Sequence, residues 1–203
     1  MALSALVPDW YRSFDDLCAS EQEGTHFKVI CSWRDSPVTI VAPHGGSIEP
    51  GTSLIAAAIA GDSFNLYCFE GLLPREEPHA RLHITSHRFD EPRCLGVVAR
   101  SDHVVTVHGM RELTERTLIG GLDETLKQAL QDRLRSAGYD AEPIEAGRYS
   151  ARNAANICNK GRRGRGVQLE LGRDLRVRLR TDSVELARFA VAIQAALTAV
   201  AAG

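Results

Sequence analysis

Hydrophobic and polar positions in the first third of the chain predict a strand, a loop and a helix in succession. Residues 38–42, Val-Thr-Ile-Val-Ala, form a β-branched run typical of a buried strand, which we expect Pro43 to end. The following segment, HGGSIEPGTS, predicts a polar loop. The run SLIAAAIAG then predicts a helix that Thr52 or Ser53 caps and Gly61 terminates. In open α/β sheets, a loop of this kind at a strand end binds ligands.

The remaining chain contains further segments of both kinds. An acidic amphipathic helix is predicted at residues 8–22, and an Ala/Leu-rich helix closes the chain at 183–202. A third helix is predicted at 122–137, where leucines recur at helical spacing. Short strands are predicted at 64–69, 81–85, 95–99, 103–108 and 167–171. With no repeat and no linker, the sequence predicts one α/β domain over residues 1–203, a three-layer sandwich around an open mixed sheet.

Composition narrows the classes of function. The chain has 203 residues, 44% hydrophobic and 25% charged, with a formal net charge of −2. This is enough apolar sequence for one core, and the balanced charge argues against a nucleic-acid partner or a disordered acidic chain. Composition predicts no oligomeric state.

Localisation and redox state follow from the N-terminus and the cysteines. The short apolar stretch before Pro8 lacks the basic start and long apolar core of a secretion signal. We recognise no run near the roughly 20 apolar residues that cross a bilayer. We therefore expect a soluble protein made in the cytoplasm, without a membrane partner, with release by lysis as the alternative.

The chain has five widely spaced cysteines and no CxxC pair. This pattern indicates reduced, mostly structural thiols and argues against a thiolate zinc site.

Candidate metal ligands lie at two predicted strand ends. His44 and Glu49 belong to the loop after the first buried strand, and His108 ends the strand at 103–108. Catalytic zinc takes three ligands from His, Asp or Glu and leaves a position for water. The alternative is that each histidine is an ordinary turn residue. The spacing of His44 and Glu49 does not decide the matter, since it is not the helical HExxH pattern.

Glu170 is a candidate general base. It interrupts the apolar strand VQLEL, with Leu169 and Leu171 on the opposite face. A carboxylate there must be paired, hydrogen-bonded or open to a cleft. In a zinc hydrolase it would take a proton from water and pass it to the leaving amine. The alternative is an ion pair with Arg173 or Arg176.

A basic segment precedes this strand. It contains Arg148, Arg152, Lys160, Arg162, Arg163 and Arg165. Arginine forks bind carboxylates with two hydrogen bonds, so the segment suits a polyanionic substrate. A solvated basic loop and a phosphate-binding patch are the alternatives.

Several long strings resemble one known family. APHGGSIEPGTS, NLYCFEGL, LHITSHRFDEP, VVTVHG and NICNKGRRGRGVQLEL occur in the order seen in the phage-type poly-γ-glutamate hydrolase family and cover about residues 30–180. The resemblance implies a zinc carboxypeptidase-like fold, one zinc ion per chain and hydrolysis of γ-glutamyl amide bonds. It implies that His44, Glu49 and His108 are the metal ligands and that Glu170 is the general base.

Substrate contacts are predicted less directly. We expect Arg93 and Arg152 to bind glutamate α-carboxylates, and Asn156 and Asn159 either to line the same cleft or to build a turn. Three polar residues at 83–90 either form a second shell around the ligand or cap a loop, namely His83, His87 and Asp90.

Two other functions stay open. One is a metal-free module that binds polyanions through the basic segment, which predicts that His44 and Glu49 do not meet His108. The other is a metallo-amidohydrolase of a small N-acyl glutamate-like acid, which predicts a closed pocket in place of an open groove.

Overall fold

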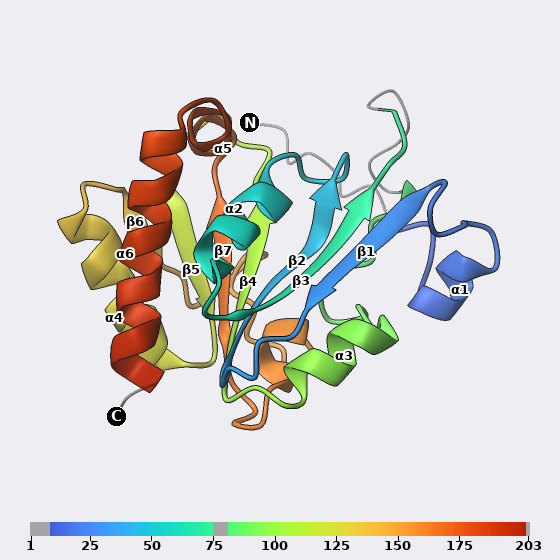
Figure 1. Cartoon of the computed structure of the whole chain (residues 1–203), viewed down its shortest axis with the longest axis horizontal. Helices are drawn as coiled ribbons and strands as arrows, with labels where there is room; N and C mark the ends of the chain where they lie inside the picture. Colours follow the sequence, from blue (N-terminus) through green and yellow to red (C-terminus); the bar gives the residue numbers. More distant parts are fainter. Residues whose placement is uncertain (1–8, 75–80, 202–203) are drawn as a thin grey trace.

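The computed structural model describes residues 9–74 and 81–201. Seven strands form one mixed sheet in the order β1-β3-β2-β4-β7-β5-β6 (Figure 1). Their bounds are β1 Phe27–Ser32, β2 Val38–Gly46, β3 Asn65–Gly71, β4 His103–Gly109, β5 Thr117–Gly121, β6 Ala141–Pro143 and β7 Val167–Leu171. Strands β3, β2, β4 and β7 are parallel, whereas β1 and β5 run antiparallel to their neighbours β3 and β7. The four parallel strands therefore end at one edge of the sheet.

Helices cover both faces of the sheet (Figure 1). They are α1 Phe14–Cys18, α2 Thr52–Ala60, α3 Pro92–Val98, α4 Glu124–Ser136, α5 Arg173–Thr181 and α6 Ser183–Ala201, with a 3₁₀ turn, η2, at Ile157–Lys160. Apolar residues of α2, α4, α5 and α6 form the larger core with one face of the sheet. Residues of α1, α3 and η2 form the smaller core on the other face. The expected three-layer α/β sandwich is confirmed.

Most predicted elements are confirmed, and two predicted strands are wrong. Residues 95–98 belong to α3 and Ala99 is its C-cap, because Glu91 accepts the Cys94 N–H as an N-cap and Pro92 starts the helix. Residues 81–85 form an irregular loop whose apolar side chains, Leu82 and Ile84, are buried in the smaller core. In both segments a short apolar run fits more than one structure.

Three boundaries also differ from prediction. Strand β2 continues past Pro43 to Gly46. Helix α2 begins at Thr52 after Gly51, which adopts φ 102° and offers no side-chain cap, although Gly61 does end the helix. The helix predicted at 8–22 shrinks to Phe14–Cys18 and is capped by Ser13, while residue 8 lies outside the described residues.

Helix α6 qualifies the expectation that no segment could cross a membrane. Within the described ranges, Ser183–Ala201 is long and apolar enough by length and composition. One face of it, including Phe189, Ile193 and Leu197, is buried in the larger core. Gln194 also donates hydrogen bonds to the carbonyls of Ala58 and Ile59. In this fold α6 is a core helix.

Candidate metal and active site

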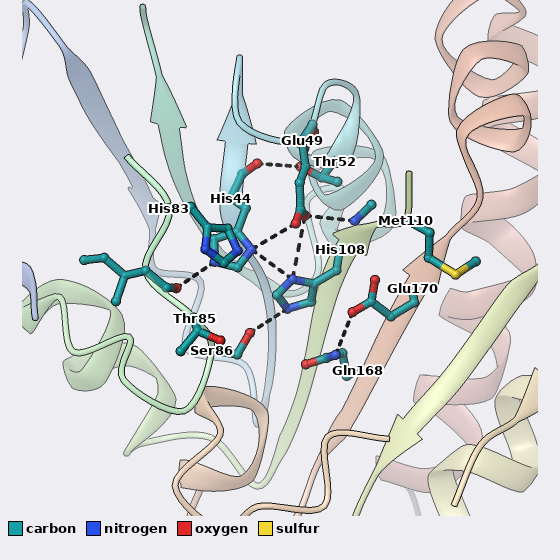
Figure 2. A network of polar contacts seen from close by, with 12 residues as sticks. His44, Glu49, Thr52, His83, Thr85, Ser86, His108, Met110, Gln168 and Glu170 are labelled. Atoms are coloured by element: carbon teal, nitrogen blue, oxygen red, sulfur yellow. Dashed lines mark hydrogen bonds and ion pairs between the residues drawn. The ribbon is translucent and has the colours of Figure 1, made fainter. Parts of the chain in front are cut away.

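The predicted ligands and base lie at the carboxyl ends of three neighbouring parallel strands (Figure 2). His44 lies near the end of β2, His108 near the end of β4 and Glu170 near the end of β7. The chain leaves β2 toward β3 through α2 on one face and reaches β4 through α3 on the other. The point where strand order reverses lies between β2 and β4, which is where ligands bind in such sheets.

A β-bulge turns His44 toward this site. Ala42 pairs with Cys68 and Gly45 with Glu70, so Pro43 and His44 together oppose one residue of β3. In a regular strand His44 would share the α2-covered face with Ala42. Its ring instead lies 6.3 Å from the ring of Phe89 in the smaller core. The proline that we expected to end the strand marks this bulge.

The two glycines after His44 allow the loop to close tightly. A Cβ atom on Gly45 would lie 1.9 Å from Ser53 Oγ, and one on Gly46, at φ 64°, would lie 2.2 Å from the Gly71 carbonyl. The Glu49 N–H then donates to the His44 carbonyl at 2.8 Å. The sequence HGGSIE therefore returns Glu49 to the side of His44.

Donor atoms of His44, Glu49 and His108 converge. His44 Nδ1 lies 3.2 Å from Glu49 Oε1 and 3.1 Å from His108 Nδ1, and His108 Nδ1 lies 3.7 Å from Glu49 Oε2. All three residues are buried. The metal-free binding module predicted that they would not meet, and this prediction is wrong.

Hydrogen bonds outside the cluster orient these atoms. His44 Nε2–H donates to the Ile84 carbonyl at 2.8 Å, so Nδ1 faces the other two residues and would present its lone pair to a metal on losing its proton. Glu49 Oε2 accepts the Gly109 N–H at 2.8 Å. A backbone partner on the far side of His44 and of Glu49 is the arrangement that orients metal ligands in proteins.

The spacing fits a zinc ion. Zinc bonds of about 2.0–2.2 Å give a tetrahedron with edges of roughly 3.3–3.6 Å, close to the three separations above. His83 offers an alternative third ligand, because His44, Glu49 and His83 each present one donor atom within 4.8 Å of the others. His83 Nδ1 lies 2.6 Å from Asp9 Oδ1, an outer contact that can orient this imidazole as well. The structure therefore offers two ligand sets, which share His44 and Glu49 and differ in whether His108 or His83 is the third residue.

Glu170 lies next to His108 across the parallel pair β4–β7. Both point away from the larger core, which contains Leu169 and Leu171 as expected. Glu170 Oε1 accepts a hydrogen bond from Gln168 Nε2 at 2.8 Å, and Gln168 Oε1 accepts one from Asn156 Nδ2 at 3.0 Å. This chain fixes one oxygen of Glu170, and no ion pair with Arg173 or Arg176 is formed within the described residues.

The two carboxylates have different electrostatic surroundings. Burial raises the pKa of Glu49, but the charge and hydrogen bond of His44 outweigh it and hold this pKa below its usual range. Burial, and then the charge of Glu49, raise the pKa of Glu170 well above its usual value. Burial lowers the pKa of His108 to about 3, so its imidazole is neutral and able to bind a metal.

A cleft of about 390 Å³ opens over these residues. Its other wall is the segment from Gly147 to Asn153, together with Asn156. Ala151 in this segment has φ 50° and its carbonyl accepts a hydrogen bond from Asn159 Nδ2 at 2.8 Å. Asn159 also accepts the Gly166 N–H, so it builds the turn and does not line the cleft.

The predicted substrate contacts are placed differently from expectation. Arg93 is outside the cleft lining, and its guanidinium donates to Glu23 and Glu91. Arg152 lines the cleft, but its Nη1 lies 3.0 Å from Glu124 and 2.5 Å from Glu145. The structure therefore gives both arginines structural ion pairs. Asn156 lines the cleft and acts on Glu170 through Gln168.

The remaining polar residues of the 83–90 segment divide in the same way. His83 and His87 line the cleft, whereas Asp90 accepts the Phe14 N–H at 2.6 Å and holds the N-terminal segment. The role of His83 and His87 in orienting a ligand stays a prediction, and the structural contact of Asp90 is with the N-terminal segment and not with the loop after residues 81–85.

Most of the basic segment is neutralised internally. Arg162 pairs with Asp102, and Arg163 and Arg165 with Asp123. Arg148 is exposed in the cleft wall, 4.7 Å from the Tyr149 ring centroid, with no carboxylate partner among the described residues. Sequence reasoning singled out neither Arg148 within this segment nor Gln168; the alternation of Gln168 with Leu169 in VQLEL was the available signal for the latter.

Comparison with known sequences identifies similar proteins. A sequence model of the poly-gamma-glutamate hydrolase family matches residues 11–189. The SPbeta prophage-derived protein YoqZ of Bacillus subtilis (strain 168) is 36% identical over 174 residues, which are 85% of this chain and 62% of YoqZ. YndL of the same organism is 32% identical over 174 residues, 85% of this chain and 68% of YndL. The chain thus spans less than two thirds of YoqZ.

Solved structures share the fold. A structure described as a bacteriophage poly-gamma-glutamate hydrolase has a TM-score of 0.89 at 29% identity and covers 95% of this chain and 98% of its own. The zinc-free apo form of YndL has a TM-score of 0.87 at 29% identity, covering 94% and 98%. An N-formylglutamate amidohydrolase from Ralstonia eutropha JMP134, at 12% identity and TM-score 0.51, covers 84% and 96% and shares the fold alone. The expected zinc carboxypeptidase-like fold is confirmed.

Proposed function

Because the chain belongs to the poly-gamma-glutamate hydrolase family, we propose that it hydrolyses γ-glutamyl amide bonds of poly-γ-glutamate with one zinc ion and Glu170 as general base. The observation that carries the proposal is the convergence of His44, Glu49 and His108, whose donor atoms lie 3.1–3.7 Å apart, with Glu170 on the neighbouring strand. A zinc ion bound there would polarise the amide carbonyl and make water acidic near neutral pH.

Glu170 would move the proton. Its Oε1 is held by Gln168, which leaves Oε2 to accept a proton from the attacking water. The water oxygen forms a bond to the carbonyl carbon, the C–N bond breaks, and Glu170 returns the proton to the leaving nitrogen. The products are a γ-carboxylate and a free α-amine.

Arg148 is our candidate for holding a substrate carboxylate near the scissile bond. It lines the same cleft as Glu170 and has no acidic partner among the described residues. An arginine fork suits a carboxylate because it offers two parallel hydrogen bonds. Arg148 therefore replaces Arg93 and Arg152 in this role.

The test combines metal analysis with cleavage of poly-γ-glutamate. We expect about one zinc per chain, release of new amino termini, loss of cleavage after chelation, and recovery on adding zinc. Glu170→Gln should keep its zinc but lose roughly 10²–10⁴-fold in kcat. Glu142→Gln removes a half-buried carboxylate of β6 that pairs with Arg116 and lines neither cleft near the site, and it serves as the control. Full activity of the chelated protein, or of Glu170→Gln, would refute the mechanism.

A further inference from the structure

A second cleft of about 440 Å³ adjoins the first. Glu49 and Gly109 line both clefts, so the two meet at the candidate metal site. Four arginines surround the second one: Arg111, Arg173, Arg176 and Arg180, which we call the arginine cleft. Two clefts with shared lining residues suit a polymer better than the single closed pocket expected for an enzyme of a small N-acyl acid.

Helix α5 supplies three of these arginines from one face. Arg173, Arg176 and Arg180 are three and four residues apart, which places them on the same side of a helix. Arg178 lies on another side and pairs with Glu115 and Glu185. The same short helix thus carries a neutralised face and a cationic face.

Arg176 forms the floor of the arginine cleft. It is buried and donates to three backbone carbonyls, those of Leu171, Pro50 and Met110. A Cβ atom on Gly109 would lie 2.5 Å from Arg176 Cζ, so the guanidinium packs directly against the end of β4. The positive charge of the Arg176 guanidinium is therefore fixed beside the candidate metal site, and no carboxylate forms a hydrogen bond or ion pair with this guanidinium among the described residues.

The other three arginines also lack acidic partners. No ion pair or hydrogen bond of the Arg111, Arg173 or Arg180 side chain is found in the described parts of the chain, and all three are exposed. The Arg180 side chain packs against Gly51: a Cβ atom added to this glycine would lie only 2.7 Å from Arg180 Cδ. The one acid in the lining, Glu49, already contacts His44 and the Gly109 N–H. Burial lowers the pKa of Arg176, the charges of Glu49 and Glu170 oppose this shift, and those of Arg173 and Arg180 add to it.

We propose that the arginine cleft binds free carboxylates of the substrate chain on one side of the scissile bond. This inference rests on the proposed function and deepens it, because it assigns the polymer a path from the cleft beside Arg148, across the metal site, to α5. A γ-linked glutamate chain carries one α-carboxylate per unit, separated by methylene groups. The arginines suit its carboxylates, and Val177, which is 49% exposed in the same lining, suits its methylenes.

Binding of end-labelled poly-γ-glutamate, followed by fluorescence anisotropy, tests this assignment. Zinc-loaded Glu170→Gln protein is the reference, because it binds without cutting. Adding Arg173→Gln and Arg180→Gln should raise Kd roughly 10-fold and weaken the dependence of Kd on NaCl concentration. Adding Arg100→Gln and Arg133→Gln instead removes the same charge far from both clefts, and should change Kd less than about twofold.

Cleavage by the otherwise native enzyme separates the possible failures. The Arg173→Gln, Arg180→Gln enzyme should show a raised KM for the polymer with kcat nearly unchanged, since neither residue touches the reacting atoms. If the wild type cuts the polymer but this variant binds it with an unchanged Kd, the arginine cleft does not bind substrate carboxylates and the proposed function still holds. Failure of the wild type to cut the polymer would overturn the proposed function and, with it, this inference.

Discussion

The strand ends of β2, β4 and β7 and the basic segment at residues 148–165 differ in what fixes their side chains. At the strand ends, His108 and Glu170 are neighbours because β4 and β7 pair in register. In the basic segment, the position of most arginines depends on which acid they meet, such as Asp123 for Arg163, and Arg148 has no such partner among the described residues. Positive charge in a sequence therefore does not predict positive charge available to a ligand, and the predictions below test this contrast.

The largest effect is expected from removing a strand-end ligand. His108→Ala should lose zinc on dialysis and at least about 10³-fold of activity, because metal activation of water is lost. His83→Ala, which removes the neighbouring imidazole from the loop, should retain about one zinc per chain. Metal content and kcat/KM measured for both variants decide between the two ligand sets. If His83→Ala loses zinc and His108→Ala keeps it, His83 is the third ligand, and the strand ends alone do not fix the metal site.

A smaller loss of activity is expected from changing Gln168, which forms a hydrogen bond with the proposed general base. Gln168→Leu removes the N–H that holds Glu170 Oε1 at 2.8 Å and should lower kcat about 10- to 100-fold with zinc retained. That hydrogen bond lowers the pKa of Glu170, so its loss should raise this pKa further. A base must be deprotonated to act, so the acidic limb of the pH profile should move to higher pH. An unchanged profile would show that Gln168 does not position Glu170.

A modest effect should distinguish two arginines four residues apart. Arg148→Gln should raise KM for poly-γ-glutamate about 5-fold, because its guanidinium has no acidic partner among the described residues. Arg152→Gln should change KM less than twofold, since Glu124 and Glu145 occupy its guanidinium. Steady-state kinetics of both variants are needed, with each serving as the other's control. Equal effects would mean that the whole basic segment acts as one charged surface.

The sequence predicted those parts of the site that depend on local chain geometry. A buried β-branched run followed by HGGSIE places His44 and Glu49 at a strand end, and VQLEL places one acid opposite two leucines. The bulge at Pro43 could not be predicted, because it depends on pairing with β3. The cationic face of α5 was missed because the helix itself was not predicted. Its nine residues include four arginines and resemble a solvated loop in sequence, and only the packing of the helix against the sheet shows which arginines face the cleft.

The smallest effect on binding is expected at Arg93, which we first assigned to the substrate. Its guanidinium contacts Glu23, which is exposed, and Glu91, which is buried and caps α3 through the Cys94 N–H. Arg93→Gln should leave KM for the polymer within twofold and lower the free energy of unfolding by about 1 kcal/mol, since Glu91 keeps its backbone partner. Urea unfolding and steady-state kinetics on one preparation measure both quantities. A large rise in KM without loss of stability would return Arg93 to the substrate site and show that ion-paired arginines of this fold remain available to ligands.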